Sequence, residues 1–293
     1  SAALARVKTE PIDAIVTDHH LIESGVPDAF AVINPKREPG DHPAANLSGS
    51  GVALKLVHAL TGELHDMDLA ALGTVADVVP LTGENRVIVA LGLRHAAKVK
   101  RPGLTELAAI GRISLDELRS DGIAYQIAPR INAGGRMGDG LTGLELLLTE
   151  SAQEARVMAE ELDAANDERK SIESETLAEA LAILKDEFAP EQRSIVLASR
   201  DWHRGVIGIV ASRIQATHYR PVILVALDND GTGRGSARSV AGFNIAAAIE
   251  SCKDYLEASG GHAMAAGVTV REEKLTAFQN AFEAAARSAL PAG

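Results

Sequence analysis

A long run of helical periodicity in the middle of the chain limits the folds that it can adopt. From position 152 to about 187, apolar residues recur at helical spacing, and Pro190 ends the run. Just before the run, Ser151 and Glu154 form a capping-box pattern, in which each side chain satisfies the other's backbone N–H. A helix of this length would extend roughly 50 Å, which is more than one domain needs. We therefore expect a connector between two domains, with its charged face in solvent.

Strand and helix patterns on either side of this run predict two α/β halves. In the first half they predict a strand at Ile12–Val16, a Pro/Gly-rich loop at 34–51, and helices at Val52–Leu60, Asp68–Gly73 and Glu84–Leu93, with Gly62 as a C-cap. In the second half they predict strands at Ser194–Ala198, Pro221–Leu227 and Ala265–Val270, a helix at Val206–Ile214 and a turn at Asp228–Gly231. The predicted fold class is therefore α/β, with two domains joined by a long helix.

The composition restricts the class of protein. With 293 residues, 46% of them hydrophobic, the chain is long enough for two cores. Its one cysteine, Cys252, cannot form a disulfide within the chain, which agrees with a reducing, cytoplasmic setting. No apolar run has the length of a membrane span and no signal peptide precedes the first strand, so we expect no membrane partner. The net charge of −11 argues against indiscriminate coating of nucleic acid, and a nucleic-acid enzyme would need a local basic surface.

A polar trio, Asp18-His19-His20, follows the predicted first strand. In an open α/β sheet, ligand crevices lie at the carboxyl ends of the strands. A carboxylate can hold an imidazole in one tautomer and leave its other nitrogen free for a divalent cation. Nitrogen and oxygen donors without thiolate suit Mn²⁺ or Mg²⁺ better than structural zinc. The alternative is a solvated loop with two unrelated histidines.

A single acid, Asp77, lies in the otherwise apolar stretch from Leu69 to Leu81. An isolated ionised carboxylate is costly to bury, so it finds a cation, a metal or hydrogen-bond donors. Asp77 could cap the helix predicted after Thr82 or accept backbone N–H bonds. Beside the histidines, a shared metal site is the interpretation that we favour, with His19 and Asp77 close together at the ends of strands.

A glycine-rich segment in the second half, residues 231–239, carries chemistry that suits a phosphate. Backbone amides and Ser236 can bind phosphate oxygens, and Arg238 can pair with the charge through two N–H groups. The helix predicted from Val206 points its free N–H groups back toward the preceding loop, and such a terminus favours an anion. The alternative for this segment is a plain hairpin with a glycine-rich strand.

Two further glycine-rich segments contain candidate binding residues. Ser259-Gly260-Gly261-His262 reads as a loop that enters a strand, and His262 is either a binding residue or part of the core. The segment 129–138 reads as a loop before the connector, with Asn132 and Arg136 pointing donors into a cleft. An ordinary interdomain turn is the alternative there. Together these segments predict anion-binding chemistry opposite a metal site.

Six motifs in a fixed order resemble those of one known family. They are VTDHH, GTVADVVPL, PRINAGGRMGD, WHRGVIGIVASRI, GSARS and GGHAMAAG. Over about residues 10 to 285 the chain resembles the RecJ-type single-stranded-DNA exonucleases of the DHH phosphoesterase superfamily. The resemblance implies the C-terminal part of a DHH domain at 1–140, a connecting helix at 141–189 and a DHH-associated nucleic-acid-binding domain at 190–293, with the active-site groove between the two domains. It also implies Mn²⁺ or Mg²⁺ as cofactor and 5′-to-3′ release of 5′-mononucleotides from single-stranded DNA, in DNA repair and recombination.

The resemblance also implies residue roles. His19 and Asp77 match metal ligands, Asp18 matches the acid that supports the histidines, and His20 matches the histidine near the ions and the scissile phosphate. The positions that match holders of the 5′-phosphate are Arg136, Ser236 and Arg238, and those that match groove contacts are Asn132 and His262. The expected substrate is single-stranded DNA with a 5′-phosphate, and a single-strand-binding protein or a helicase is a further partner to test.

The chain departs from the family pattern at both ends. Family members carry further aspartates upstream of the DHH motif and usually an OB-fold downstream, and we expect this chain to be a central fragment that is weak or inactive alone. Two other functions fit the same residues. One is a DHH phosphodiesterase that acts on short oligonucleotides or cyclic dinucleotides. The other is a non-catalytic DHH-fold scaffold in a replication assembly.

Overall fold

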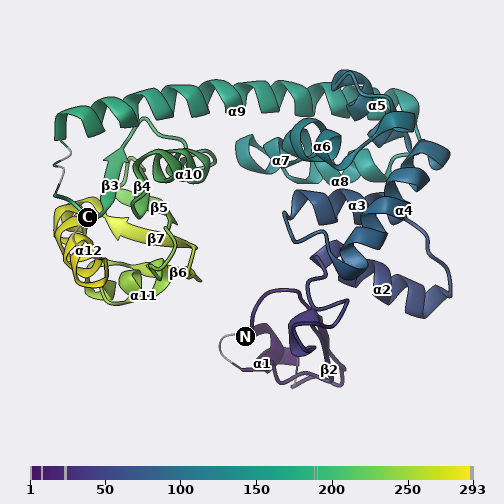
Figure 1. Cartoon of the computed structure of the whole chain (residues 1–293), viewed down its shortest axis with the longest axis horizontal. Coiled ribbons are helices and arrows are strands. Elements are labelled where there is room, and N and C mark those ends of the chain that lie inside the picture. The colour runs from purple at the N-terminus through teal and green to yellow at the C-terminus, as the bar shows by residue number, and fades with distance from the viewer. Residues whose placement is uncertain (1, 8, 23–24, 188, 190, 291–293) are drawn as a thin grey trace. The chain divides into compact units, whose positions relative to one another are not determined.

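The chain forms two compact units. The computed structural model describes residues 2–7, 9–22, 25–187, 189 and 191–290. The first unit comprises residues 1–135 and 139–164, and the second comprises 136–138 and 165–293. Figure 1 labels the helices and strands of both. Among the described residues, no helix has both the length and the apolar character that crossing a membrane requires.

The first unit is mostly helical. Its elements are α1 (Ala2–Val7), β1 (Ile15–Thr17), β2 (Ala31–Ile33), η1 (Pro35–Arg37), α2 (Gly49–Thr61), α3 (Met67–Ala76), α4 (Gly83–Val99), α5 (Pro102–Ile110), η2 (Leu115–Glu117), α6 (Ser120–Gly122), the π-helical η3 (Ile123–Ile127), α7 (Ala128–Met137), α8 (Leu141–Leu148) and the first part of α9 (Ala152–Glu187). β1 and β2 pair in parallel. The main core contains Leu107, Ile127, Leu146 and Leu162, which are almost fully buried.

Several predicted bounds in this unit were wrong by a few residues. The first strand is Ile15–Thr17 rather than Ile12–Val16, because only three of its residues have a partner on β2. The helix predicted from Val52 begins at Gly49, since the hydroxyl of Ser48 caps it by accepting the Gly51 N–H. The next two helices, α3 and α4, are longer than predicted at both ends. Gly62 caps α2 in the left-handed region with φ 74°, as predicted.

Helix α9 confirms the predicted long helix, since it runs unbroken over 36 residues from Ala152 to Glu187. Its capping box is half formed. Ser151 Oγ accepts the Glu154 N–H at 3.2 Å, as predicted. The Glu154 carboxylate instead accepts the hydroxyl of Thr149, because the Thr149 oxygen itself takes the Ser151 N–H. Within α9, the residues up to 164 belong to the first unit and the later residues belong to the second unit.

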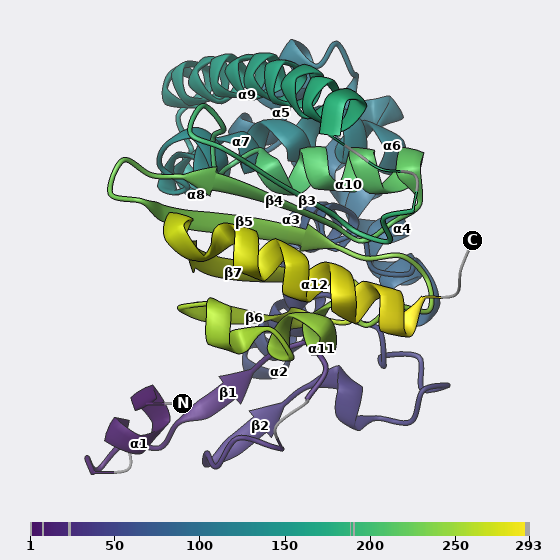
Figure 2. The ribbon, with the colours of Figure 1, turned by 90° about the vertical axis from the view of Figure 1, so that its left-hand side faces the viewer.

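The second unit is a five-stranded sheet with helices on both faces (Figures 1 and 2). Its elements are β3 (Ile195–Ser199), α10 (Ile207–His218), β4 (Val222–Leu227), β5 (Thr232–Arg238), α11 (Ile245–Glu250), η4 (Lys253–Tyr255), β6 (Ala258–His262), β7 (Ala265–Arg271), η5 (Glu272–Lys274) and α12 (Leu275–Ala289). The strand order is β3-β4-β5-β7-β6, and only β3 and β4 are parallel.

Strand β4 is buried on both faces, which explains its continuous apolar run. Val222 and Leu224 pack with α10 and the end of α9. Ile223 and Val225 face the other way and pack with Phe278 and other residues of α11 and α12. The two helical layers therefore clamp the middle of the sheet from opposite sides.

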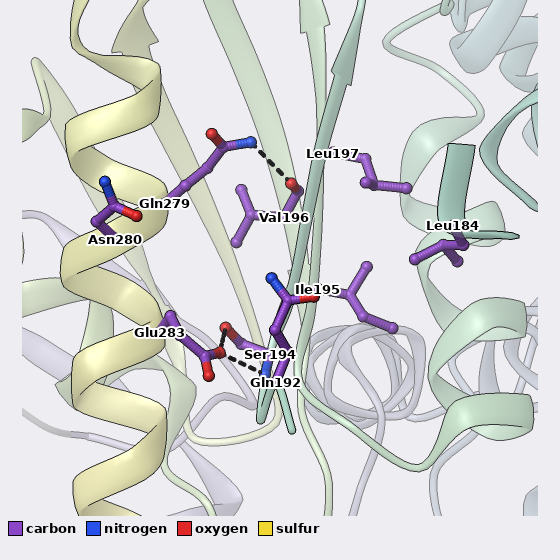
Figure 3. Close-up of a pocket in the computed structure, with 9 residues that line it drawn as sticks. All are labelled: Leu184, Gln192, Ser194, Ile195, Val196, Leu197, Gln279, Asn280 and Glu283. Atoms are coloured by element: carbon purple, nitrogen blue, oxygen red, sulfur yellow. Dashed lines mark hydrogen bonds between the residues drawn. The ribbon is translucent and has the colours of Figure 1, made fainter. Parts of the chain in front are cut away.

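The outer edge of β3 is capped by side chains of α12 (Figure 3). Gln279 donates to the backbone oxygen of Val196 at 2.9 Å. Glu283 accepts the backbone N–H and the hydroxyl of Ser194 at 2.9 and 2.6 Å, and it also accepts the Arg193 N–H. A pocket of about 220 Å³ lies at this edge. These contacts occupy part of the hydrogen-bonding edge that another strand would otherwise use.

Two of the three glycine-rich segments, 129–138 and 259–262, were wrongly predicted as loops, and all three segments lie in regular elements. Residues 128–137 form helix α7, residues 232–238 form β5, and residues 258–262 form β6. The turn at Asp228–Gly231 is confirmed, with Gly231 at φ 77°. For residues 231–239, the alternative of a hairpin with a glycine-rich strand describes the structure.

Candidate functional site

The Asp18-His19-His20 trio follows β1 directly and is shaped by Asp18. Its backbone N–H donates to Ile33 of the β2 strand at 3.0 Å. The Asp18 Oδ1 accepts the N–H groups of His19 and His20 at 2.7 and 3.2 Å and lies 2.7 Å from His20 Nδ1. Partial burial raises the pKa of Asp18, but the hydrogen bonds from His20 and His19 outweigh it and hold that pKa below its ordinary value. Asp18 is thus a carboxylate that orients the histidines.

His19 and Asp77 lie together, as the sequence predicts. The distance from His19 Nδ1 to Asp77 Oδ2 is 3.4 Å, and the side chains are 20% and 38% exposed. Asp77 ends helix α3, where its N–H donates to Gly73, so the prediction that it lies at the end of a strand was wrong. The apolar residues before Asp77 lie in α3, where most of them are buried, and not in a strand.

An open pocket of about 320 Å³ surrounds this pair. It is lined by His19, Gly49, Ser50, Gly73, Ala76, Asp77 and Asn132. Helices α2 and α3 approach closely here, because a Cβ on Gly73 would lie 2.6 Å from Ser50 Oγ. Asn132 comes from α7, so an amide joins the imidazole and the carboxylate in one pocket of the first unit.

The residue after Asp77 has a strained backbone. Val78 has φ 58°, which places a β-branched residue in the left-handed region. That conformation costs about 1–2 kcal/mol for a residue with a Cβ. It stops α3 at Asp77 and leaves the Val78 side chain 86% exposed.

The donor set around Asp77 suits a divalent cation in kind but supplies few ligands. Imidazole nitrogen and carboxylate oxygen are ligands for Mn²⁺ and Mg²⁺. Within the part of the chain that the structure describes, no three His, Cys, Asp or Glu side chains are grouped to hold a metal ion. His19 and Asp77 therefore form a two-ligand pair.

A second group of polar residues surrounds Arg238 on β5. Its Nε donates to Ser212 Oγ on α10 at 3.0 Å, and its Nη1 donates to Ser236 Oγ at 3.0 Å and to the Ala237 oxygen at 2.8 Å. Burial lowers the pKa of the Arg238 guanidinium, and the charge of Arg136 lowers it further. Two guanidinium groups therefore repel each other in this part of the second unit.

Arg136, at the end of α7, donates to the Gly205 oxygen at 3.1 Å. Burial lowers its pKa, the charge of Arg169 lowers it further, and Glu173 acts in the opposite direction. Glu173 is itself buried, with a side chain 4% exposed, and pairs with Arg169 and with Arg213 at 2.7 Å. Arg136, Arg169, Arg213 and Glu173 all belong to the second unit.

His262 shares a row of the sheet with Arg238. Ala265 of β7 is paired with Arg238 on one side and with His262 on the other. Residues paired in this way point to the same face of a sheet, so Ser236, Arg238 and His262 belong to one face, the one that carries α10. Asn132, by contrast, lies with His19 and Asp77 in the first unit.

Comparisons with known proteins agree with the motifs. Residues 1–77 match the DHH family, N-terminal domain, and residues 191–288 match the DHHA1 domain. The single-stranded-DNA-specific exonuclease RecJ of Bacillus subtilis (strain 168) is 42% identical over 265 residues, which is 89% of this chain and 34% of that protein. A crystal structure of exonuclease RecJ bound to manganese aligns with a TM-score of 0.82 at 35% identity, over 99% of this chain and 73% of that one. The chain belongs to the RecJ family.

A RecJ from Thermus thermophilus, solved in complex with Mn²⁺, aligns with a TM-score of 0.87 at 36% identity, over 99% of this chain and 43% of that one. These matches confirm the α/β class with DHH and DHHA1 domains. The curated RecJ relatives are longer, since this chain spans between 34% and 53% of their length. The activity, substrate and metal ions of these relatives are therefore proposed for this chain in the next section.

Sequence reasoning missed the buried charges beside the RecJ motifs. Arg169 belongs to the charged face of α9 that was predicted to be solvated, and Glu173 lies one turn later on the same helix. Their i, i+4 spacing was visible, but the burial depends on Arg213 of α10, which lies far along the chain. Ser212 and Gly208 of α10 were also missed, although both fall within the quoted motif WHRGVIGIVASRI.

Proposed function

We propose that the RecJ-family protein containing this chain hydrolyses single-stranded DNA from its 5′ end, releasing 5′-mononucleotides with divalent metal ions. The observation that carries the proposal is the 3.4 Å separation of His19 Nδ1 and Asp77 Oδ2, two side chains from separate family motifs. Relatives named single-stranded-DNA-specific exonuclease support the substrate class. Neighbours solved with Mn²⁺ and with Mg²⁺ support the cofactor class.

In this proposal His19 and Asp77 would hold a divalent metal ion, which would supply the Lewis-acid chemistry that activates water for phosphodiester hydrolysis. Asp18 keeps the His20 imidazole in place through its 2.7 Å contact with Nδ1. In the proposal His20 lies near the metal ion and the scissile phosphate. Asn132 adds an amide donor to the same pocket. Because a catalytic site needs more than two ligands, the proposal concerns the full-length protein.

We propose that Arg136, Ser236 and Arg238 bind the 5′-terminal phosphate, with His262 as a further contact on the same face of the sheet. The charge of Arg136 lowers the pKa of the Arg238 guanidinium, and a dianionic terminal phosphate would relieve that repulsion. An internal phosphodiester carries one charge and would relieve it less. This difference would distinguish a strand end from its interior.

The remaining proposals concern the domain bounds, the cellular location and the partner proteins. We assign residues 1–140 to the DHH domain, 141–189 to the connector and 190–293 to the DHH-associated domain. A cytoplasmic role in DNA repair and recombination, with a single-strand-binding protein or a helicase as partner, is supported by the family membership alone. A binding assay with each purified partner tests it.

The metal assignment is tested by His19→Ala in the full-length protein. Release of 5′-mononucleotides in Mn²⁺ should fall by at least about 100-fold, the lower end of what one catalytic group contributes. Mn²⁺ affinity measured by calorimetry should fall with it, while the thermal unfolding midpoint should stay unchanged. The control is His65→Ala, since His65 is an exposed histidine outside the pocket.

A His19→Ala enzyme with the wild-type rate in Mn²⁺ would overturn the metal assignment. The wild-type enzyme should also prefer long single strands to dinucleotides. Faster cleavage of dinucleotides or cyclic dinucleotides would instead support a small-substrate phosphodiesterase, and no turnover of any of them would support a scaffold.

A further inference from the structure

The first turn of α10 lies directly against the Arg238 guanidinium. A Cβ built on Gly208 would lie 2.9 Å from Arg238 Nη2 and 2.9 Å from Ser236 Oγ. Ordinary van der Waals contacts of a Cβ lie between 3.4 and 4 Å. Any side chain at position 208 would therefore displace the arginine or the serine.

The backbone oxygen of Gly208 also accepts a hydrogen bond from the Ser212 hydroxyl, which contacts Arg238. Ser212, one turn later on α10, donates its hydroxyl to the Gly208 oxygen at 3.0 Å. The same Ser212 oxygen accepts from Arg238 Nε at 3.0 Å. Because the Ser212 proton is committed to Gly208, the Ser212 lone pairs face the guanidinium. Gly208 and Ser212, at i and i+4 on one face of the helix, thus set the position of Arg238 together.

The backbone of α10 gives no reason for a glycine at this position. Gly208 is in the first turn of a regular helix and is not among the described glycines with positive φ. Alanine is the better helix former, so helix stability disfavours glycine there. The close approach to Ser236 and Arg238 is the physical reason that remains.

We propose that Gly208 is a specificity-determining residue for the terminal phosphate. The missing side chain allows Ser236, Arg238 and the Gly208 N–H to meet the same phosphate. The Ile207 N–H donates to His203 and the Ile209 N–H to Val206, whereas the described contacts give the Gly208 N–H no acceptor, and such an amide at a helix N-terminus favours an anion. A methyl group at position 208 would turn Arg238 Nη2 aside and cover that amide. The inference rests on the proposed function, because it presumes that this site takes the 5′-phosphate.

The experiment compares two substrates in the full-length enzyme, a single-stranded oligonucleotide with a 5′-phosphate and the same oligonucleotide with a 5′-hydroxyl. The measured quantity is the ratio of kcat/KM for the two. Gly208→Ala should lower this ratio by about tenfold, the value of one charge-assisted hydrogen bond, while the thermal unfolding midpoint stays equal or rises.

A second pair of variants keeps the test decisive if Gly208→Ala fails to fold. Ser212→Ala should lower the ratio as well, because Arg238 loses its Nε acceptor. The matched control is Thr217→Ala, since Thr217 lies on the same helix and its hydroxyl also bonds the backbone four residues earlier, at Arg213. In the described contacts the Thr217 hydroxyl bonds no guanidinium group, so the Thr217→Ala variant should keep the ratio.

Arg238→Ala separates the inference from the proposed function. If Arg238→Ala lowers the ratio and neither Gly208→Ala nor Ser212→Ala does, the role of Gly208 is wrong and the phosphate site stands. If Arg238→Ala leaves the ratio unchanged, the phosphate site itself is wrong. A lower ratio in Arg238→Ala, Gly208→Ala and Ser212→Ala, with an unchanged ratio in Thr217→Ala, supports both the phosphate site and the role of Gly208.

Discussion

Asp68→Asn tests whether one buried ion pair supports the first unit. The Asp68 side chain is fully buried, and its Oδ2 accepts from Arg101 Nε at 2.9 Å. His95 Nδ1 lies 3.2 Å from the other oxygen. Arg101 also pairs with Asp66 at 2.7 Å, and Asp66 is 55% exposed. The same arginine therefore serves a buried and an exposed acid.

Breaking a buried pair by removing one partner costs about 3–5 kcal/mol, whereas an exposed pair is worth about 0–1 kcal/mol. Asp66 still compensates Arg101 in Asp68→Asn, so we expect the lower end, about 3 kcal/mol of unfolding free energy. Asp66→Asn is the matched control and should cost less than about 1 kcal/mol. Urea unfolding followed by circular dichroism measures both. Fluorescence of Trp202, the single tryptophan, follows the second unit in the same samples.

The pH dependence of the Asp68→Asn effect has a definite sign. Burial raises the pKa of Asp68, but the hydrogen bonds and charge of Arg101 outweigh it, and the net pKa lies below the ordinary value. A carboxylate with a lowered folded pKa stabilises the fold above its unfolded pKa of about 3.9 and loses that effect as pH falls through the folded pKa. The cost of Asp68→Asn should therefore be complete at pH 7 and shrink below about pH 4. Equal costs for Asp68→Asn and Asp66→Asn at pH 7 would refute the reasoning.

Two further predictions concern stability. Gly92→Ala should cost about 1–3 kcal/mol in urea unfolding, because a Cβ there would collide with the backbone of α3. Gly40→Ala, where a Cβ meets no atom within 4 Å, is its control, and equal costs would contradict the packing argument. Glu283→Ala should cost about 1–3 kcal/mol, since it leaves the Ser194 N–H without its acceptor. Faster amide exchange at Ser194 should accompany the loss, and Asn280→Ala in the same pocket should show neither change.

The sequence predicted features that depend on local pattern. The long helix α9 follows from periodicity and a cap within one segment, and its predicted bounds agree with the structure. The proximity of His19 and Asp77 also followed from local signals, since polar ligand atoms ended two apolar runs. The element that carries Asp77 did not, because a short buried helix and a short buried strand have the same apolar composition.

The glycine-rich segments show why the rest could not be predicted. In α7, Gly134 reads as a loop signal, but a Cβ there would lie 3.0 Å from both Leu162 Cδ2 and the Asp139 oxygen. Gly235 of β5 is similar, since a Cβ would lie 2.5 Å from Val268 Cγ2. These glycines allow close packing against partners distant in sequence, whereas the sequence patterns read them as backbone turns. Buried Glu173 was missed for the same reason, since its burial depends on a partner from α10.

The left-handed backbone of Val78 has a consequence for laboratory evolution of this protein. Glycine adopts φ 58° without steric cost, so Val78→Gly removes a penalty of about 1–2 kcal/mol in the folded state. A screen for heat resistance should therefore select this substitution. The same change frees the chain directly after Asp77, whose carboxylate lies beside His19 in the proposed metal site. A library selected for survival at high temperature should therefore accumulate changes at position 78. A library selected for turnover should keep a side chain there and gain its stability elsewhere.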